Sequence, residues 1–134
     1  MLVDACGIPL SFLVSGANVH DSKKLGELLD ARIVKAPQDT EENVCLDAGC
    51  VGKEEDVRTR GCIPHIRPRG EEISESELNP DYKPRRWVVE CSHSWTNRFR
   101  KLIPIYEKTD WSYCGLLTLA CAMITLNKAV IIYG

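Results

Sequence analysis

The chain of 134 residues is long enough for one domain with a modest hydrophobic core. Hydrophobic residues make up 44% of it and charged residues 27%, which are ordinary proportions for a soluble globular protein. The net charge of −2 excludes a protein that binds nucleic acid through the basicity of its whole chain.

The seven cysteines are odd in number, form no Cys-x-x-Cys pair and mostly lie in apolar runs. This usage indicates a reducing compartment, so we expect a cytoplasmic protein without a disulfide framework. A zinc site formed by Cys45, Cys50, Cys62 and His65 is the alternative, although the spacing of these residues is irregular. Asp4 precedes any apolar region, so we expect no signal peptide.

An antiparallel hairpin is the first element predicted along the chain. Met1–Cys6 and Leu10–Ser15 are β-prone, and the Gly7-Ile8-Pro9 sequence between them is typical of a turn. We therefore expect these two segments to pair.

A short helix over Leu25–Leu29 is predicted next. Asp21 or Ser22 is suited to capping it, because a short polar side chain accepts hydrogen bonds from the first backbone N–H groups. A catalytic pair of His20 and Asp21 is the alternative reading of the same residues.

The short apolar run Asn43–Leu46 ends at Asp47 and is followed by Gly49. This pattern predicts a buried parallel strand whose carboxyl end presents an acid, with the glycine allowing a tight turn. Asp47 is suited equally to capping the next helix and to binding a metal ion.

A short charged helix over Val51–Thr59 is expected to end before Gly61. Cys62–Ile66 is then predicted as a strand, with Pro64 placing it near a sheet edge or at a strand start. The polar segment Arg67–Pro84, with Gly70, Pro80 and Pro84, is predicted to be a loop insertion.

The stretch Arg85–Lys101 has two faces at helical spacing. Its apolar stripe consists of Trp87, Cys91, Trp95, Phe99 and Leu102. Its polar side consists of Arg86, Glu90, His93, Asn97, Arg100 and Lys101. A lone carboxylate among cations suits a metal site on a polyanion, because the acid binds Mg²⁺ while the cations hold phosphate. A surface ion pair between Arg86 and Glu90 is the alternative.

The apolar run Tyr113–Tyr133 is interrupted by Thr118, Thr125, Asn127 and Lys128. A membrane span needs about 20 predominantly apolar residues, so we expect a buried core helix and no membrane partner. The predicted order is hairpin, helix, strand, helix, strand and then helices. This is the α/β order of an RNase H-like core that lacks its first strand.

Three motifs in this order resemble the C-terminal part of the catalytic domain of bacterial insertion-sequence transposases of the DDE type. The first is Asp4-x-x-Gly7-Ile8-Pro9-Leu10, leading to Gly16-Ala17-Asn18-Val19-His20-Asp21-Ser22. The second is Leu46-Asp47-Ala48-Gly49, and the third is Arg86-x3-Glu90 running into Trp95-x-Asn97-Arg98-Phe99-Arg100-Lys101. Together they span nearly the whole chain.

The resemblance implies phosphodiester cleavage and strand transfer on DNA, with Mg²⁺ or Mn²⁺ as the cofactor. Asp47 and Glu90 match the second and third catalytic acids and are implied to be metal ligands. The residues implied to contact the DNA of the transposon ends are Arg85, Arg86, Arg98, Arg100 and Lys101.

Two departures from the family pattern shape the prediction. Asn97 stands where the family signature has a lysine, seven residues after Glu90. The family's first catalytic Asp lies upstream of the hairpin, and Asp4 instead matches a residue near the hairpin turn. We therefore expect a truncated catalytic domain that is inactive alone and works with an upstream fragment or a full-length transposase. A non-catalytic DNA-binding or partner-binding remnant that uses the basic helix is the alternative.

Overall fold

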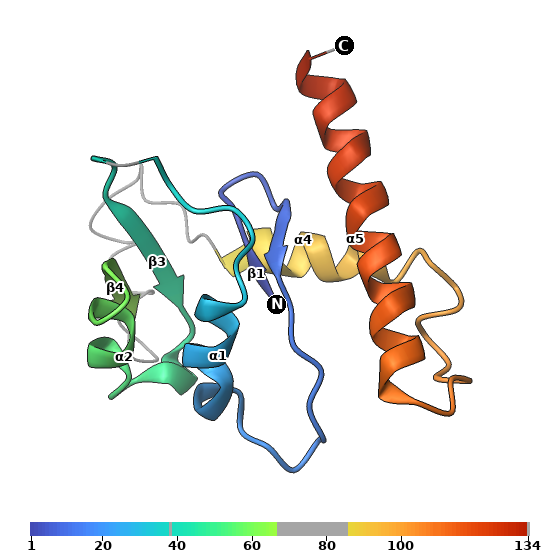
Figure 1. Cartoon of the computed structure of the whole chain (residues 1–134), viewed down its shortest axis with the longest axis horizontal. Coiled ribbons are helices and arrows are strands. Elements are labelled where there is room, and N and C mark those ends of the chain that lie inside the picture. Colours follow the sequence, from blue (N-terminus) through green and yellow to red (C-terminus); the bar gives the residue numbers. More distant parts are fainter. Residues whose placement is uncertain (38, 67–85, 134) are drawn as a thin grey trace, which may run out of the picture. The chain divides into compact units, whose positions relative to one another are not determined.

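A computed structural model describes residues 1–37, 39–66 and 86–133 (Figure 1). The chain is a mixture of helices and strands, as predicted. It divides into two compact units: unit 1 comprises Met1–Val14 and Trp87–Gly134, and unit 2 comprises Ser15–Arg86. The predicted loop insertion over 67–84 and the predicted DNA contact Arg85 lie outside the described residues.

Unit 1 begins with the predicted hairpin, in which β1 (Leu2–Val3) pairs antiparallel with β2 (Pro9–Ser11). The carboxylate of Asp4 organises the turn, since its Oδ1 accepts from the backbone N–H groups of Cys6 and Ile8, both at 2.8 Å. These bonds explain why a strand-breaking acid stands at this position.

The helix predicted over Arg85–Lys101 is shorter than expected. As α4 it covers Arg86–Thr96, and hydrogen-bonded turns follow it to Leu102. Phe99 is half-buried and Leu102 is buried, so both stay on the apolar side although neither is helical. The apolar residues were correctly predicted to share one side. The turns that hold Phe99 and Leu102 keep the helical spacing, so the sequence pattern did not show where the helix ends.

The hairpin turn and α4 are in close contact within unit 1. The buried Ser92 hydroxyl donates to the Gly7 carbonyl at 2.7 Å. A Cβ atom added to Gly7 would lie 3.0 Å from Ser92 Oγ and 3.1 Å from the Trp95 ring, and the φ angle of Gly7 is +81°. The turn therefore needs glycine both for its backbone conformation and for its contact with α4.

The predicted C-terminal helix is present as α5 (Asp110–Tyr133), but the prediction of a buried core helix is wrong for much of its surface. Ala120, Cys121 and Ile124 are buried, whereas Leu119 and Leu126 are exposed. By length and composition alone, Asp110–Ile131 could also cross a membrane, and 17% of its apolar window is buried.

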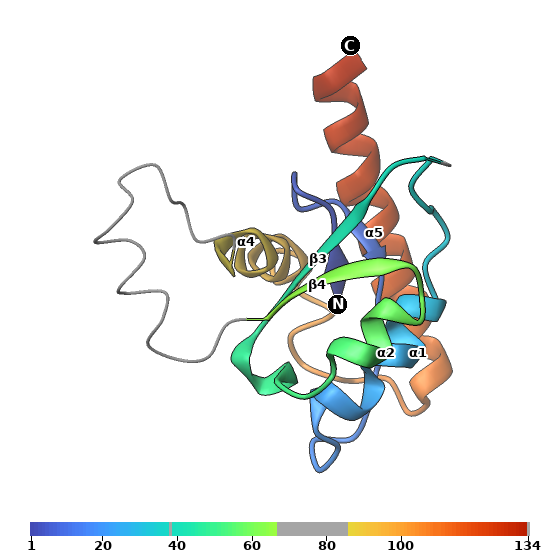
Figure 2. The ribbon, with the colours of Figure 1, turned by 90° about the vertical axis from the view of Figure 1, so that its left-hand side faces the viewer.

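Unit 2 contains a parallel strand pair, β3 (Glu42–Leu46) and β4 (Cys62–Ile66), which Figure 2 shows side by side. Between them lie the 3₁₀ turn η2 (Ala48–Cys50) and the helix α2 (Glu54–Arg58). The parallel pairing is as expected, because this connection is a β–α–β crossover. β3 is not buried on both faces as predicted, since its residues alternate in exposure.

Helix α1 (Leu25–Asp30) of unit 2 follows the 3₁₀ turn η1 (Asp21–Lys24). Leu25 and Leu29 are buried in the core of the unit, which also contains Val44, Val57 and Cys62. The predicted caps Asp21 and Ser22 are wrong. His20 is the N-cap of η1, where its Nδ1 accepts from the Ser22 backbone N–H at 3.3 Å, and Lys24, the N-cap of α1, makes no capping bond with its side chain.

Candidate functional site

Asp47 lies at the carboxyl end of β3, where ligand-binding residues of parallel sheets are commonly found. It is the N-cap of η2, and its Oδ1 accepts from the Ala48 backbone N–H at 2.7 Å. The capping reading of the sequence is therefore confirmed. It leaves the metal reading open, because a carboxylate has a second oxygen and further lone pairs.

The surroundings of Asp47 hold a second acid that the sequence did not link to it. Burial raises the pKa of the Cys50 thiol, and the negative charges of Asp47 and Asp21 raise it further. Both carboxylates therefore lie near this half-buried thiol, at the contact between η1 and η2. The ring of His20 is also close, with Cε1 3.8 Å from where a Cβ of Gly49 would stand.

No group of three or more His, Cys, Asp or Glu side chains is arranged to hold a metal ion among the described residues. The alternative zinc site is not formed within unit 2. Cys62 is buried on one face of the strand pair, whereas Cys45 and His65 are exposed on the other.

Glu90 is exposed on α4 in unit 1. Arg86 begins the same helix, but the description of this residue stops at its backbone. The ion-pair and phosphate readings of these two residues both stay predictions. Asp47 belongs to unit 2 and Glu90 to unit 1, so a metal site shared by these two acids also stays a prediction.

The predicted DNA contacts Arg98, Arg100 and Lys101 are exposed in the turns that follow α4. The backbone there is fixed by successive hydrogen bonds, including Phe99 N–H to the Thr96 carbonyl at 3.0 Å and Leu102 N–H to the Phe99 carbonyl at 2.8 Å. A tight turn thus presents three cations within four residues of sequence, a local concentration of charge suited to a polyanion.

A fourth cation of unit 1 lies near these residues. The Lys128 ammonium is 4.3 Å from the centre of the Trp95 ring, within the range of a cation–π interaction. Lys128 and Arg98 both line a hollow of about 250 Å³ beside this ring. Lys128 was not among the basic residues predicted for the site from the sequence. A usable signal was present, because Lys128 is the only charged residue in the run Tyr113–Tyr133.

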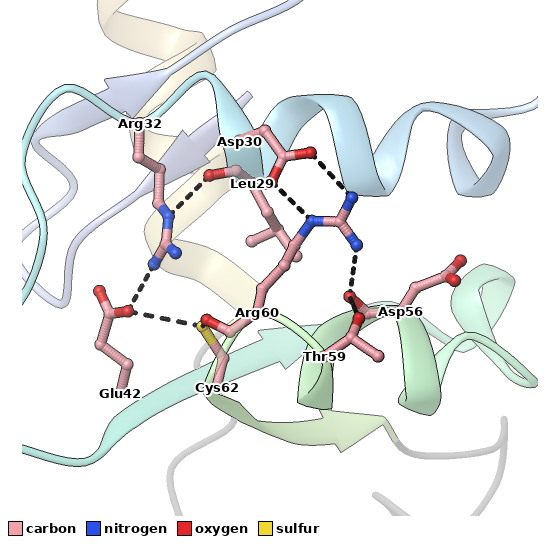
Figure 3. Close-up of polar contacts among 8 residues, drawn as sticks. All are labelled: Leu29, Asp30, Arg32, Glu42, Asp56, Thr59, Arg60 and Cys62. Carbon is pink, nitrogen blue, oxygen red and sulfur yellow. Dashed lines mark hydrogen bonds and ion pairs between the residues drawn. The ribbon is translucent and has the colours of Figure 1, made fainter.

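Charged residues in unit 2 fix the strand that carries Asp47 (Figure 3). Arg32 donates to the Glu42 carboxylate at 2.7 Å, at the start of β3. Arg60, just before β4, makes two 2.8 Å bonds to the carboxylate of Asp30 in α1. The two arginines therefore connect the α1 region to the starts of both strands.

Glu42 is the most strongly coordinated acid of this group. Burial raises its pKa, but hydrogen bonds from Arg32, the Cys62 thiol and the Ala36 backbone outweigh that effect, so the net pKa lies below its ordinary value. The side chain of Arg32 is only 7% exposed. This pair is therefore structural, because it keeps a nearly buried guanidinium neutralised.

Comparisons with known proteins identify the family of this chain. A family model described as a transposase DDE domain matches residues 44–127, which include Asp47 and Glu90. The chain therefore belongs to the DDE transposase family, as the sequence motifs indicated. A Burkholderia cepacia protein named as a transposase for insertion sequence element IS402 is 31% identical over 134 residues. The alignment covers 95% of this chain and 61% of that relative, and no solved structure gives a significant match.

Proposed function

We propose that this chain is part of an insertion-sequence transposase, an enzyme that cuts and joins DNA with an RNase H-like domain. In this proposal the chain supplies two of the three catalytic acids, Asp47 and Glu90. The observation that carries the proposal is the position of Asp47, at the carboxyl end of a parallel strand within the matched family region. The hydrogen bond from Ala48 supports a fixed orientation of its carboxylate.

The donor chemistry fits Mg²⁺ or Mn²⁺, because both proposed ligands are carboxylates and hard cations prefer oxygen. When bound, the ions would activate the attacking oxygen and stabilise the leaving one. Asp47 would be held by its cap at the end of β3, while Glu90 would approach from α4. The third acid of the family pattern would come from an upstream segment.

Cations of unit 1 are proposed to hold the DNA backbone. Arg98, Arg100 and Lys101 are exposed in one turn and Lys128 lies beside Arg98, so phosphates could be bound without overall basicity. Arg85 and Arg86 are proposed to contact the DNA as well, as the family resemblance implies.

Strand cleavage of a nicked or branched DNA with Mn²⁺ tests the proposal, with and without an added segment that supplies the upstream strand and its Asp. We expect cleavage only with the added segment. Asp47→Asn and Glu90→Gln should each abolish cleavage. Because asparagine keeps a side-chain oxygen that can accept the Ala48 hydrogen bond, Asp47→Asn separates the metal role of Asp47 from its capping role. Glu55→Gln, at an acid whose side chain is 80% exposed, is the matched control and should retain activity.

The second candidate is a DNA-binding or partner-binding module without catalysis. The exposed cations after α4 favour it, because phosphate binding by side chains needs no metal ion. DNA binding that is independent of Mn²⁺ and lost in Arg98→Ala or Arg100→Ala, with no cleavage by a folded and complemented protein, would select this reading.

A further inference from the structure

A regular apolar stripe follows the outer side of α5. Leu116, Leu119, Met123, Leu126 and Val130 are spaced at alternate steps of three and four, which is the heptad pattern of a helix-to-helix seam. The last four of these residues are 59%, 46%, 63% and 60% exposed. We call these five residues the outer stripe.

The outer stripe is distinct from the face that α5 uses inside unit 1. Ala120, Cys121 and Ile124 are buried, and Lys128 covers the Trp95 ring. Both views show α4 crossing α5 rather than running along it (Figures 1 and 2). A helix that is apolar on all sides normally has all sides covered, so the outer stripe needs a partner.

A hollow beside the outer stripe indicates what kind of partner fits. Leu116, Leu119 and Met123 line it together with Phe99 and Leu102, and its volume is about 230 Å³. Small-molecule sites typically measure about 300–1,000 Å³, so this hollow is better matched to one or two inserted aliphatic side chains.

We propose that the outer stripe pairs antiparallel with the outer stripe of a second copy of this chain. In that register Leu119 lies opposite Val130 of the other copy, and Met123 lies opposite Leu126, so the seam is complementary to itself. The C-terminal half of one α5, where Val130 and Ile131 are 60% and 77% exposed, then meets the hollow of the other copy. A parallel pair would bring the two hollows together and leave a void, which is unfavourable.

The flanking residues and the charge pattern agree with this partner. Ala122 and Ala129 border the stripe and allow two helices to approach closely. No charged residue occurs between Asp110 and Lys128, so two copies would not repel and a nucleic acid would find no cation there. The exposed stripe represents on the order of 500 Å² per copy, which places the pair near the lower size limit of specific dimers.

A lipid bilayer is the other apolar environment that suits a helix of this length. Insertion of α5 would expose Lys128 and would remove Ile124 from the core of unit 1. The second copy covers the outer stripe while leaving those contacts intact, and is therefore favoured. The proposal does not depend on catalysis.

Sedimentation velocity of the 134-residue chain, from nanomolar to high-micromolar concentration, tests the proposal. We expect a monomer–dimer equilibrium that Leu126→Lys weakens by about tenfold or more. Thr118→Lys adds the same charge to an exposed position outside the stripe and should leave the equilibrium unchanged. Near-ultraviolet circular dichroism checks that both variants stay folded.

A double variant tests the orientation of the pair. Met123→Glu combined with Leu126→Lys places opposite charges across an antiparallel seam and like charges across a parallel one, so it should dimerise better than either single variant. A wild-type monomer at all concentrations, a dimer insensitive to Leu126→Lys, or partition of the wild type into phosphatidylcholine vesicles that Leu126→Lys abolishes would each overturn the proposal.

Discussion

At the scale of single residues, the clearest electrostatic feature is the Arg32–Glu42 pair. The guanidinium is nearly buried, so its partner has to be charged for the pair to be neutral. The carboxylate is also held by the Ala36 backbone N–H at 3.3 Å, which ties the loop before β3 to the strand itself. Acid should therefore loosen the start of β3.

The pair gives a pH-dependent prediction. Because the pKa of Glu42 is lowered in the folded state, its stabilisation is fully present above the ordinary glutamate pKa of about 4.3 and is lost as the pH falls through the folded value. Glu42→Gln should cost about 1–2 kcal/mol at neutral pH and flatten the acid limb of stability, measured by urea unfolding. Glu41→Gln, at an exposed neighbouring acid, should change neither property. Equal acid limbs for wild type and Glu42→Gln would refute this role.

At the scale of elements, the contact between the hairpin turn and α4 holds the two distant parts of unit 1 together. Ser92 Oγ also lies 3.1 Å from the Val88 carbonyl within its own helix. The serine is therefore held at the position where it meets Gly7, and the glycine has little room to change.

Two glycine substitutions separate conformational strain from crowding. Gly7 and Gly52 have similar φ angles of +81° and +86°, but an added Cβ at Gly52 would have nothing within 4 Å. Gly52→Ala should lower the free energy of unfolding by about 1 kcal/mol, because only the strain of a left-handed residue is added. Gly7→Ala should lower it by about 1–3 kcal/mol more, because the added Cβ also overpacks the contact with α4. Chemical denaturation measures both, and equal losses would contradict the close packing of Gly7 against α4.

The elements also show what the sequence could predict. Strand β4 was predicted at its observed bounds and β3 to within one residue, because short apolar runs bounded by glycine, proline and acids have few alternatives. The end of α4 was missed, since Phe99 and Leu102 point inward from turns at helical spacing. The cap of η1 was missed because an imidazole nitrogen replaced the usual short oxygen side chain.

The candidate site was predictable to a similar extent. Asp47 and Glu90 could be proposed from the sequence because each stands in a short motif, and both positions lie in the range that the family model matches. The proximity of Asp21 to Cys50 and that of Lys128 to Trp95 depend on contacts between segments far apart in sequence, which periodicity does not reveal. Exposure of the outer stripe was also hidden, because apolar content alone does not tell an inner face from an outer one.

At the scale of the whole molecule, the distribution of charge matters more than its sum. The chain carries a net charge of −2, yet Arg98, Arg100, Lys101 and Lys128 belong to one unit and three of them to a single turn. Binding to DNA should therefore be dominated by local phosphate contacts and should weaken steeply with salt.

The salt dependence gives a quantitative prediction. Each of Arg98→Ala and Arg100→Ala should reduce the slope of log Kd against log salt by about 1, with similar losses on different DNA sequences. Lys108→Ala, at an exposed cation of the same unit outside this turn, should leave the slope unchanged. Fluorescence anisotropy with a labelled duplex measures the slopes, and an identical slope in all variants would exclude the turn as the contact.

The composition of unit 1 from two separated segments has a consequence for synthesis on the ribosome. Residues 1–14 emerge first, but the helices that complete their unit are made only after all of unit 2. At about 5–20 residues per second, the nascent hairpin waits several seconds for α4. During that time unit 2 can fold, while β1 and β2 remain available to chaperones or to neighbouring chains on the same messenger RNA.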